Sequence, residues 1–312
     1  MCGPRLALYQ MSNEDLIKRI ERLKRERKAV ILVHNYQRPE VQDIADFLGD
    51  SLELSRKAAG TDAEVIVFCG VHFMAETAKM LSPDRTVLMP DPRAGCPMAD
   101  MITAAQLREE RAKHNGATVV TYVNSSAAVK AESDYCCTSS NAVAVVKAIE
   151  AEEIMFVPDR YLGDYVQRQT GRHMHLWRGF CPTHVAIRPE DIERAREQHP
   201  DAEVLVHPEC SPEVIKLADM ALSTSGICKR ARESAAETLI IGTEVGILHR
   251  LRRDNPEKTF VPATARAVCP NMKLCTLEKV VWCLQDLANE ITVDEDIRRR
   301  AKQAIDRMVA IS

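Results

Sequence analysis

Three Cys-Pro dipeptides recur along this chain of 312 residues at nearly even spacing. They begin at Cys96, Cys181 and Cys269, so 85 residues separate the first two cysteines and 88 separate the last two. Each dipeptide follows an apolar, strand-like stretch. Thiolates bind zinc and iron–sulfur clusters, and three of them leave one coordination position open. The spacing therefore predicts one metal centre that the three cysteines share.

The kind of metal centre follows from what the sequence lacks. A structural zinc site normally has four protein ligands, two of them in a short C-x-x-C hairpin, and no such hairpin occurs here. Three thiolates without it favour a [4Fe–4S] cluster in which one iron has no protein ligand. The other eight cysteines break the spacing and are interpreted as core or surface thiols: Cys2, Cys69, Cys136, Cys137, Cys210, Cys228, Cys275 and Cys283.

The composition is that of a globular protein, with 46% hydrophobic and 28% charged residues. A net charge of −3 offers no basic stripe, so we expect no nucleic-acid partner. No run of about 18 apolar residues occurs, which argues against a membrane span. The N-terminus lacks the apolar segment of a signal peptide, and the odd number of cysteines argues against a disulfide scaffold. We therefore expect a cytoplasmic protein.

The elements that must position the cysteines recur in three copies. Each copy has apolar, β-branched stretches between helical patterns, which is typical of a parallel sheet covered on both faces. Asp46, Asp134 and Asp219 lie 50, 47 and 50 residues before the three cysteines. A fixed period indicates a repeat architecture. We predict an α/β fold of three αβα sandwich domains, each with a small parallel sheet, related by pseudo-threefold symmetry around a central active site.

The period also sets the predicted domain boundaries. Residues 1–28 contain an amphipathic helix from Asn13 to Lys28, with Ser12 as its N-cap. The three αβα repeats are residues 29–114, 115–200 and 201–312, the last of them with additional C-terminal helices. In the first repeat, we expect the first strand to lead into a helix that ends at Gly49.

Polar residues follow the first predicted strand of each repeat. They are His34 and Tyr36, then Tyr122 and Asn124, then His207 and Glu209. A hydroxyl group follows the first helix of each repeat, at Ser51, Ser139 and Thr224. Ligands of parallel α/β sheets bind beyond the carboxyl ends of the strands, so these residues would line one cavity with the cysteines. Imidazole, phenol and carboxylate groups suit proton transfer, whereas hydroxyl groups at helix starts suit phosphate or carboxylate binding.

Each of these residues also has a purely structural interpretation. A single histidine at a strand end is often a core residue, and Ser or Thr at a helix start is often only a cap. The matched positions in three repeats favour a shared site instead. The remaining seven histidines have no repeat partner and are interpreted as structural or surface residues: His72, His114, His173, His175, His184, His199 and His249.

With these residues in view, the chain resembles the quinolinate synthase family. The resemblance covers nearly the whole chain and is carried by HNYQRPEVQDIADFLGDSLELS, TYVNSSAAVKAESD, TSSNA, GFCPTH, VHPEC, STSG, CPNMK and TLEK. It implies three αβα domains with pseudo-threefold symmetry and a [4Fe–4S] cluster bound by Cys96, Cys181 and Cys269. Some relatives carry a C-x-x-C-x-x-C run that ends at the third ligand. Ala263 and Arg266 occupy the other two positions here, so a regulatory disulfide there is not available.

The resemblance also implies the reaction. Iminoaspartate and dihydroxyacetone phosphate would condense to quinolinate, phosphate and water in de novo NAD biosynthesis, with a functional link to an L-aspartate oxidase. An open iron of the cluster would act as a Lewis acid. The implied catalytic residues are Tyr36, Tyr122, His207 and Glu209. The implied substrate-binding residues are His34, Ser51, Tyr122, Asn124, Ser139, His207, Glu209 and Thr224.

The spacing of the three cysteines alone is also compatible with two other functions. One is a different [4Fe–4S] dehydratase that acts on a small phosphorylated or dicarboxylic substrate. The other is a non-catalytic sensor in which the three cysteines form a metal or redox switch. A sensor has no need for His34, Tyr36 and Glu209 around one cavity, so the polar strand ends favour an enzyme.

Overall fold

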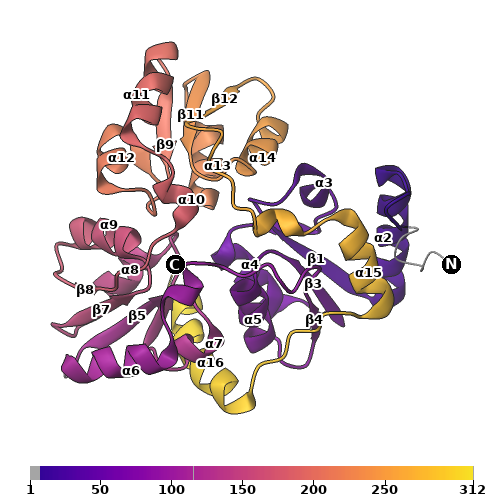
Figure 1. The fold of residues 1–312 in the computed structure, drawn as a ribbon, viewed down its shortest axis with the longest axis horizontal. Coiled ribbons are helices and arrows are strands. Elements are labelled where there is room, and N and C mark those ends of the chain that lie inside the picture. Colours follow the sequence, from indigo (N-terminus) through magenta and orange to yellow (C-terminus); the bar gives the residue numbers. More distant parts are fainter. Residues whose placement is uncertain (1–7, 115, 312) are drawn as a thin grey trace. The chain divides into compact units, whose positions relative to one another are not determined.

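The computed structural model describes residues 8–114 and 116–311, and within them it contains three parallel sheets of four strands each (Figure 1). The first sheet consists of β1 (Ala29–His34), β2 (Phe47–Gly49), β3 (Val65–Cys69) and β4 (Thr86–Leu88). The second consists of β5 (Thr118–Tyr122), β6 (Tyr135–Cys137), β7 (Ile154–Val157) and β8 (His175–Leu176). The third consists of β9 (Glu203–Val206), β10 (Met220–Ala221), β11 (Thr238–Gly242) and β12 (Thr259–Pro262). In every sheet the spatial order is second, first, third, fourth, which confirms the predicted α/β fold with three small parallel sheets.

The third strand of a sheet is apolar on both faces and is therefore buried. All five residues of β3 and all four of β7 are buried. A strand without a polar face must be covered by helices on both sides, which explains the continuous apolar stretches in the sequence. The sheets have separate hydrophobic cores, which include Val67 in the first, Met155 in the second and Ile240 in the third.

Helices connect consecutive strands in each repeat. In the first repeat they are α3 (Pro39–Gln42), α4 (Ser51–Gly60) and α5 (His72–Leu81), and α6 (Ala104–Lys113) leads into the second. The second contains α7 (Ala127–Lys130), α8 (Ala142–Lys147) and α9 (Arg160–Thr170), and α10 (Pro182–Val185) and α11 (Pro189–Gln198) lead into the third. The third contains α12 (Pro212–Leu217), α13 (Thr224–Glu233) and α14 (Ile247–Asp254).

The predicted helix that ends at Gly49 was wrong. Only one helical turn, α3, follows β1, and the chain then forms the edge strand β2. Asp46 explains the difference. Its backbone N–H donates to the carbonyl of Ile31 at 3.0 Å, and its carboxylate accepts the N–H of Ile31 at 2.8 Å. These two bonds draw the chain alongside β1, and a strand of three residues gives too little pattern to be recognised in the sequence.

The same pair of bonds recurs in the other two repeats. Asp134 makes both bonds with Val119, at 3.0 and 2.8 Å, and Asp219 makes both with Val204, at 2.9 and 2.7 Å. The evenly spaced aspartates therefore have a structural function, because each one fixes where the edge strand joins its sheet.

The N-terminal helix α2 (Asn13–Arg27) is confirmed, and it ends one residue earlier than predicted. Ser12 caps it by accepting the N–H of Asp15 at 3.2 Å, and Lys28 ends it in the left-handed region at φ 46°. Its buried face, which includes Leu16 and Ile20, packs beside α15 (Leu277–Asp286) and against β1 (Figure 1).

The C-terminal segment adds no strand to the third sheet within the described residues. Helix α15 packs on α2, and α16 (Glu295–Ala310) packs on α7 and β6 (Figure 1). The chain accordingly forms two compact units. The first comprises the chain up to Cys96 with Pro270–Asp294, and the second comprises Pro97–Cys269 with the chain from Glu295 onward. The first unit contains one sheet and the second contains two. None of the described helices is long and apolar enough to cross a bilayer.

Candidate active site

The three cysteines of the Cys-Pro dipeptides lie in equivalent loops after the fourth strands. In each repeat, a backbone N–H three residues beyond the third strand donates to the carbonyl two residues before the cysteine. The three donor–acceptor pairs are His72 and Ala94 at 2.8 Å, Arg160 and Gly179 at 2.9 Å, and Val245 and Ala267 at 2.9 Å. The fold therefore places Cys96, Cys181 and Cys269 at the same point of three repeats, the first in one unit and the other two in the second unit.

One of these loops requires glycine. A Cβ atom on Gly179 would lie 2.4 Å from the carbonyl oxygen of Pro158, which is too close for any side chain. Gly179 also pairs with Asp159 in a parallel bridge. The loop of Cys181 therefore runs directly against the end of β7.

Exposure separates these three cysteines from the others. Among the ten cysteines that the structure describes, Cys96, Cys181 and Cys269 are half-buried and the other seven are buried. Burial raises the pKa of the Cys136 thiol to about 12 and that of Cys137 well above its ordinary value. A buried thiol of this kind is a poor ligand, because metals bind the thiolate. Cys2 lies outside the described residues.

His34 and His207 have the same local geometry at the ends of β1 and β9. The Nδ1 atom of His34 accepts the backbone N–H of Tyr36 at 3.2 Å, and Nδ1 of His207 accepts that of Glu209 at 3.3 Å. In a neutral ring this contact leaves the proton on Nε2. Nε2 of His207 lies 3.1 Å from Oγ of Ser139, to which it can donate. Both rings are thus oriented to present an N–H away from the backbone.

Glu209 is the centre of a buried polar cluster in the second unit. Its Oε1 accepts the Tyr122 hydroxyl at 2.5 Å, and its Oε2 lies 2.7 Å from Nδ1 of His184. Nε2 of His184 lies 2.8 Å from Oγ1 of Thr243, and the His184 ring stacks on His207 with 4.6 Å between ring centroids. The cluster joins residues from the second and third repeats, as the sequence predicted for Tyr122, Ser139, His207 and Glu209.

The sequence interpretation missed His184. It was assigned to the structural or surface histidines because no repeat partner exists for it. The side chain is buried, and its Nδ1 lies 3.1 Å from Sγ of Cys181 as well as close to Glu209. The signal was local, because the sequence Cys-Pro-Thr-His places Cys181 and His184 on the same side of the single turn α10.

The surroundings of Glu209 favour its charged form. Burial alone would raise the pKa of this carboxyl, but the imidazoles of His184 and His207 and the Tyr122 hydroxyl outweigh burial and hold the pKa below its usual range. Glu209 is therefore an ionised hydrogen-bond acceptor. The transferable protons of the cluster belong to the tyrosine and the histidines that contact it.

Asp159 and Glu244 are further polar residues that the sequence did not single out. Asp159 is fully buried after β7, where its Oδ1 accepts two N–H groups of α9 while its Oδ2 has no hydrogen-bond partner in the part of the chain that the structure describes. Burial and the nearby charge of Glu209 raise its pKa well above the usual value. Glu244 follows β11 and accepts the N–H of Cys269 at 3.0 Å, so it holds the third cysteine loop in place.

Two of the three predicted hydroxyl residues, Ser51 and Thr224, lie at helix starts, but neighbouring residues cap those helices; Ser139 lies in the loop before α8. Asp50 is the N-cap of α4 and Ser223 that of α13, so Ser51 and Thr224 occupy the first helical position. Ser51 and Thr224 therefore begin two helices of ten residues without serving as their caps. Ser140, next to Ser139, donates to Ser223 at 2.9 Å and ties the second repeat to the third.

The structure also places Asn124 and Tyr36, two further residues that the sequence predicted for the site. Oδ1 of Asn124, just beyond β5, is buried and has no hydrogen-bond partner among residues 8–114 and 116–311. An acceptor left in this state is normally satisfied by water or ligand. In the first unit, the ring of Tyr36 lies edge-on to His34 with 4.7 Å between centroids, and both side chains are buried.

Three parallel sheets, a buried acid–base cluster at carboxyl strand ends and half-buried cysteine loops define an α/β enzyme. The chain belongs to the NadA family, described as Quinolinate synthetase A protein, whose model matches residues 18–310. It is 54% identical over 302 residues to the quinolinate synthase of Dehalococcoides mccartyi, covering 97% of this chain and 100% of that protein. It is 56% identical over 300 residues to the quinolinate synthase of Desulforudis audaxviator, covering 96% and 99%. It is 54% identical over 302 residues to quinolinate synthase 2 of Methanosarcina acetivorans, covering 97% of each chain.

Proposed function

We propose that this protein is a quinolinate synthase that condenses iminoaspartate with dihydroxyacetone phosphate to give quinolinate, phosphate and water. The observation that carries the proposal is the family match over residues 18–310 together with relatives covered along nearly their full length. The buried cluster around Glu209 supports it, because a sequence of isomerisation, imine formation and dehydration needs several positioned proton donors and acceptors.

The proposed substrates are anionic, and the site offers matching donors. Iminoaspartate carries two carboxylates and dihydroxyacetone phosphate carries a phosphate. We assign their binding to the hydroxyl groups of Ser51 and Thr224, at the first positions of α4 and α13, because helix N-termini favour anions. The N–H groups of Leu52 and Glu53 in α4 are already bonded to the carboxylate of Asp50, so they are not part of this assignment. Ser139 and the Nε2–H groups of His34 and His207 supply further donors, and Asn124 supplies an acceptor.

Proton transfer is assigned to the residues around Glu209. Because its carboxylate is held in the charged form, Glu209 acts by keeping Tyr122 and His184 oriented. Tyr122 and His207 then exchange protons with substrate oxygen and carbon atoms. Tyr36, beside His34, is assigned the corresponding function in the first repeat.

Members of this family use a [4Fe–4S] cluster, and the donor set of this chain fits one. Cys96, Cys181 and Cys269 would hold it, since they are the half-buried thiols in three equivalent loops whereas the other described cysteines are buried. Three thiolates leave one iron without a protein ligand. When bound, the cluster supplies a Lewis acid that polarises an oxygen or nitrogen atom of the substrate.

The remaining expectations are also proposals. Thiolates that hold an iron–sulfur cluster require a reducing compartment, which supports a cytoplasmic location. Iminoaspartate is an oxidation product of aspartate, so a functional link to an L-aspartate oxidase is consistent with the chemistry. The repeats at residues 29–114, 115–200 and 201–312 are proposed as the units of internal symmetry around one active site.

The proposal is tested by purifying the protein without oxygen, measuring iron and sulfide, and assaying quinolinate formation from the two substrates. We expect about four irons per chain and quinolinate as product. A Cys181→Ala variant should lose both the cluster and the activity, whereas Cys283→Ala, which removes a buried thiol of α15, should retain both. Bound zinc in place of iron, or a cluster that survives Cys181→Ala, would contradict the ligand assignment. A loaded cluster without quinolinate formation would favour another dehydratase.

A further inference from the structure

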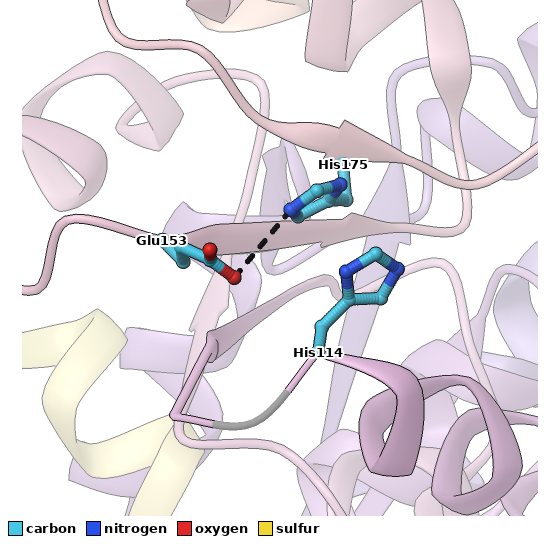
Figure 2. A group of neighbouring side chains, drawn as sticks. All are labelled: His114, Glu153 and His175. Atoms are coloured by element: carbon cyan, nitrogen blue, oxygen red, sulfur yellow. Dashed lines mark ion pairs between the residues drawn. The ribbon is translucent and has the colours of Figure 1, made fainter.

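We propose that His114, Glu153 and His175 form a separate binding site for a divalent metal ion of the zinc type on the second repeat (Figure 2). One ligand atom from each residue lies within 4.8 Å of the other two. Two imidazoles and one carboxylate are a donor set that proteins use for Zn²⁺, with the fourth position open to water. This site is distinct from the three cysteines and does not depend on the proposed function.

Three different elements bring the ligands together. His114 follows the last residue of α6, Glu153 immediately precedes β7, and His175 is the first residue of β8. Nε2 of His175 lies 3.7 Å from Oε2 of Glu153, and the two imidazole rings lie with 3.8 Å between their centroids. Figure 2 shows the three side chains grouped around one small space, with the carboxylate directed at His175.

The distances suit a tetrahedral ion after small side-chain rotations. Ligand atoms at about 2.0–2.1 Å from Zn²⁺ lie roughly 3.3 Å from one another. The 3.7 Å contact between His175 and Glu153 is near that value already. The other pairs of ligand atoms lie at most 4.8 Å apart. Rotation of these partly exposed side chains about their χ angles can shorten such distances to about 3.3 Å.

A neighbouring carboxylate orients one of the imidazoles. Nε2 of His114 lies 3.5 Å from Oε1 of Glu110 on α6. In Figure 2 the other ring nitrogen of His114 faces the side on which Glu153 and His175 lie. A carboxylate behind a ligating histidine fixes the ring and raises its basicity, which is common in zinc sites. The exposed His173, whose ring centroid lies 6.1 Å from that of His175, is a further imidazole near the same place.

The fold itself does not require a histidine at position 175. The strand register pairs Val67 with Leu88, Met155 with His175, and Ile240 with Val261, so Leu88, His175 and Val261 are equivalent. The first and third repeats therefore have an aliphatic residue at this position, as expected for a strand next to a buried one. A polar imidazole beside a second imidazole and a carboxylate is a departure that packing does not explain.

The site lies at the edge of the sheet opposite the Glu209 cluster. Its residues are at the amino ends of β7 and β8, whereas Tyr122 is at the carboxyl end of β5. A strand of five residues spans roughly 15 Å, so a metal ion here does not contact the substrate. Side chains of His114, His175 and Glu153 are 25%, 35% and 56% exposed, which makes the site accessible to an exchanging ion. A bound metal ion would connect the end of α6 to the amino ends of β7 and β8.

The test uses anaerobically prepared protein with its cluster loaded, so that the cluster cysteines are occupied. We expect Co²⁺ to bind one site per chain with the visible absorption of a tetrahedral ion, and Zn²⁺ to displace it. His175→Ala and Glu153→Gln should each weaken binding tenfold or more. His199→Ala is the matched control, because His199 follows α11 as His114 follows α6, at nearly the same backbone angles. Quinolinate formation should be equal in all of these proteins.

Thermal unfolding provides a second measurement. Zinc at 100 times its dissociation constant should raise the unfolding temperature of the wild type and of His199→Ala by several degrees, but not that of Glu153→Gln. Glu153 is exposed, so this variant keeps its fold even if His175→Ala does not. Identical Co²⁺ isotherms in the wild type and Glu153→Gln, or no saturable binding in the wild type, would overturn the proposal.

Discussion

Glu209 illustrates how a single side chain obtains its properties from distant parts of the sequence. Its carboxylate contacts Tyr122, which precedes it by 87 residues, and His184 from the cysteine loop. Burial would neutralise an isolated carboxyl at this place, whereas two imidazoles and a phenol keep it charged. At the residue scale, the charge state of Glu209 therefore depends on a group of contacts rather than on any one residue.

Replacement of Glu209 by glutamine should separate chemistry from cluster binding. The amide keeps the size of the side chain but loses the charge, and its single oxygen can accept from only one of Tyr122 and His184. We expect kcat to fall by about 10²–10⁴, with the iron content unchanged. Glu203→Gln is the control, because Glu203 lies at the amino end of β9, where its carboxylate pairs with Arg230, whereas Glu209 lies beyond the carboxyl end. Equal kcat in the wild type and Glu209→Gln would remove Glu209 from the chemistry.

Replacement of His184 should change the pH dependence of the reaction. His184 is one of the groups that lower the pKa of Glu209, so His184→Asn should raise that pKa. Activity that requires the charged carboxylate is lost as pH falls through its pKa, and the acid limb of the kcat/KM profile should therefore move to higher pH. The measurement is the pH profile of the variant beside that of the wild type. An unchanged acid limb would show that the charge of Glu209 does not control it.

At the scale of elements, the edge strands depend on one aspartate in each repeat. Asp46, Asp134 and Asp219 each bond to both backbone groups of a residue on the first strand of their sheet. In the first and third repeats, the edge strand leads directly to the helix whose first residue carries the proposed anion-binding hydroxyl, whereas Ser139 of the second repeat lies in the loop before α8. A structural aspartate thus precedes each hydroxyl residue that we propose for anion binding by five positions.

Asp219→Ala should destabilise the third repeat. Removal of the carboxylate leaves the N–H of Val204 without its acceptor, and this loss costs about 1–3 kcal/mol. Urea unfolding gives the change in the free energy of unfolding. Asp201→Ala, at an exposed position just before β9, should change it by less than about 0.5 kcal/mol. Equal stabilities of the two variants would show that this contact does not hold the edge strand.

At the scale of the whole molecule, the C-terminal segment returns to the first sheet. Lys279 of α15 lies 2.7 Å from the buried carboxylate of Asp91, which belongs to the loop that carries Cys96. Arg27 of α2 also donates to backbone carbonyls at the end of α15. The first unit is therefore completed by a residue 188 positions after Asp91, so its packing includes the segment Pro270–Asp294.

The Asp91 contact predicts a pH-dependent contribution to stability. Hydrogen bonds from Arg93 and Lys279 outweigh burial and hold the pKa of Asp91 below its usual range. Stability from this pair is present above about pH 4, the value for an unfolded aspartate, and is lost as pH falls toward the lowered pKa. The free energy of unfolding of Asp91→Asn should be lower at pH 7 and should fall less steeply below pH 4. Asp84→Asn, at an exposed position of the same unit, should follow the wild type.

The sequence by itself determined the repeat, the fold class and the apolar positions of the longer strands and helices. Apolar stretches rich in β-branched residues indicate buried parallel strands, because both faces of such strands must be covered. The threefold period places Cys96, Cys181 and Cys269 in equivalent loops. The sequence also indicated Tyr122, Ser139, His207 and Glu209, because a polar residue at a strand end has a defined place in a parallel sheet.

Only the tertiary structure decided which side chains meet. His184 has no repeat partner, and its contact with Thr243 joins residues 59 positions apart. Asp159 and Glu244 occupy the same position, two residues beyond β7 and β11, but the first repeat has Val71 there, so the period did not single them out. The edge strands could not be predicted from the sequence, because two or three residues carry no measurable period, and their pairing is set by hydrogen bonds from an aspartate to the neighbouring strand. Likewise, the grouping of His114, Glu153 and His175 follows from strand register, which fixes neighbours that are far apart in the chain.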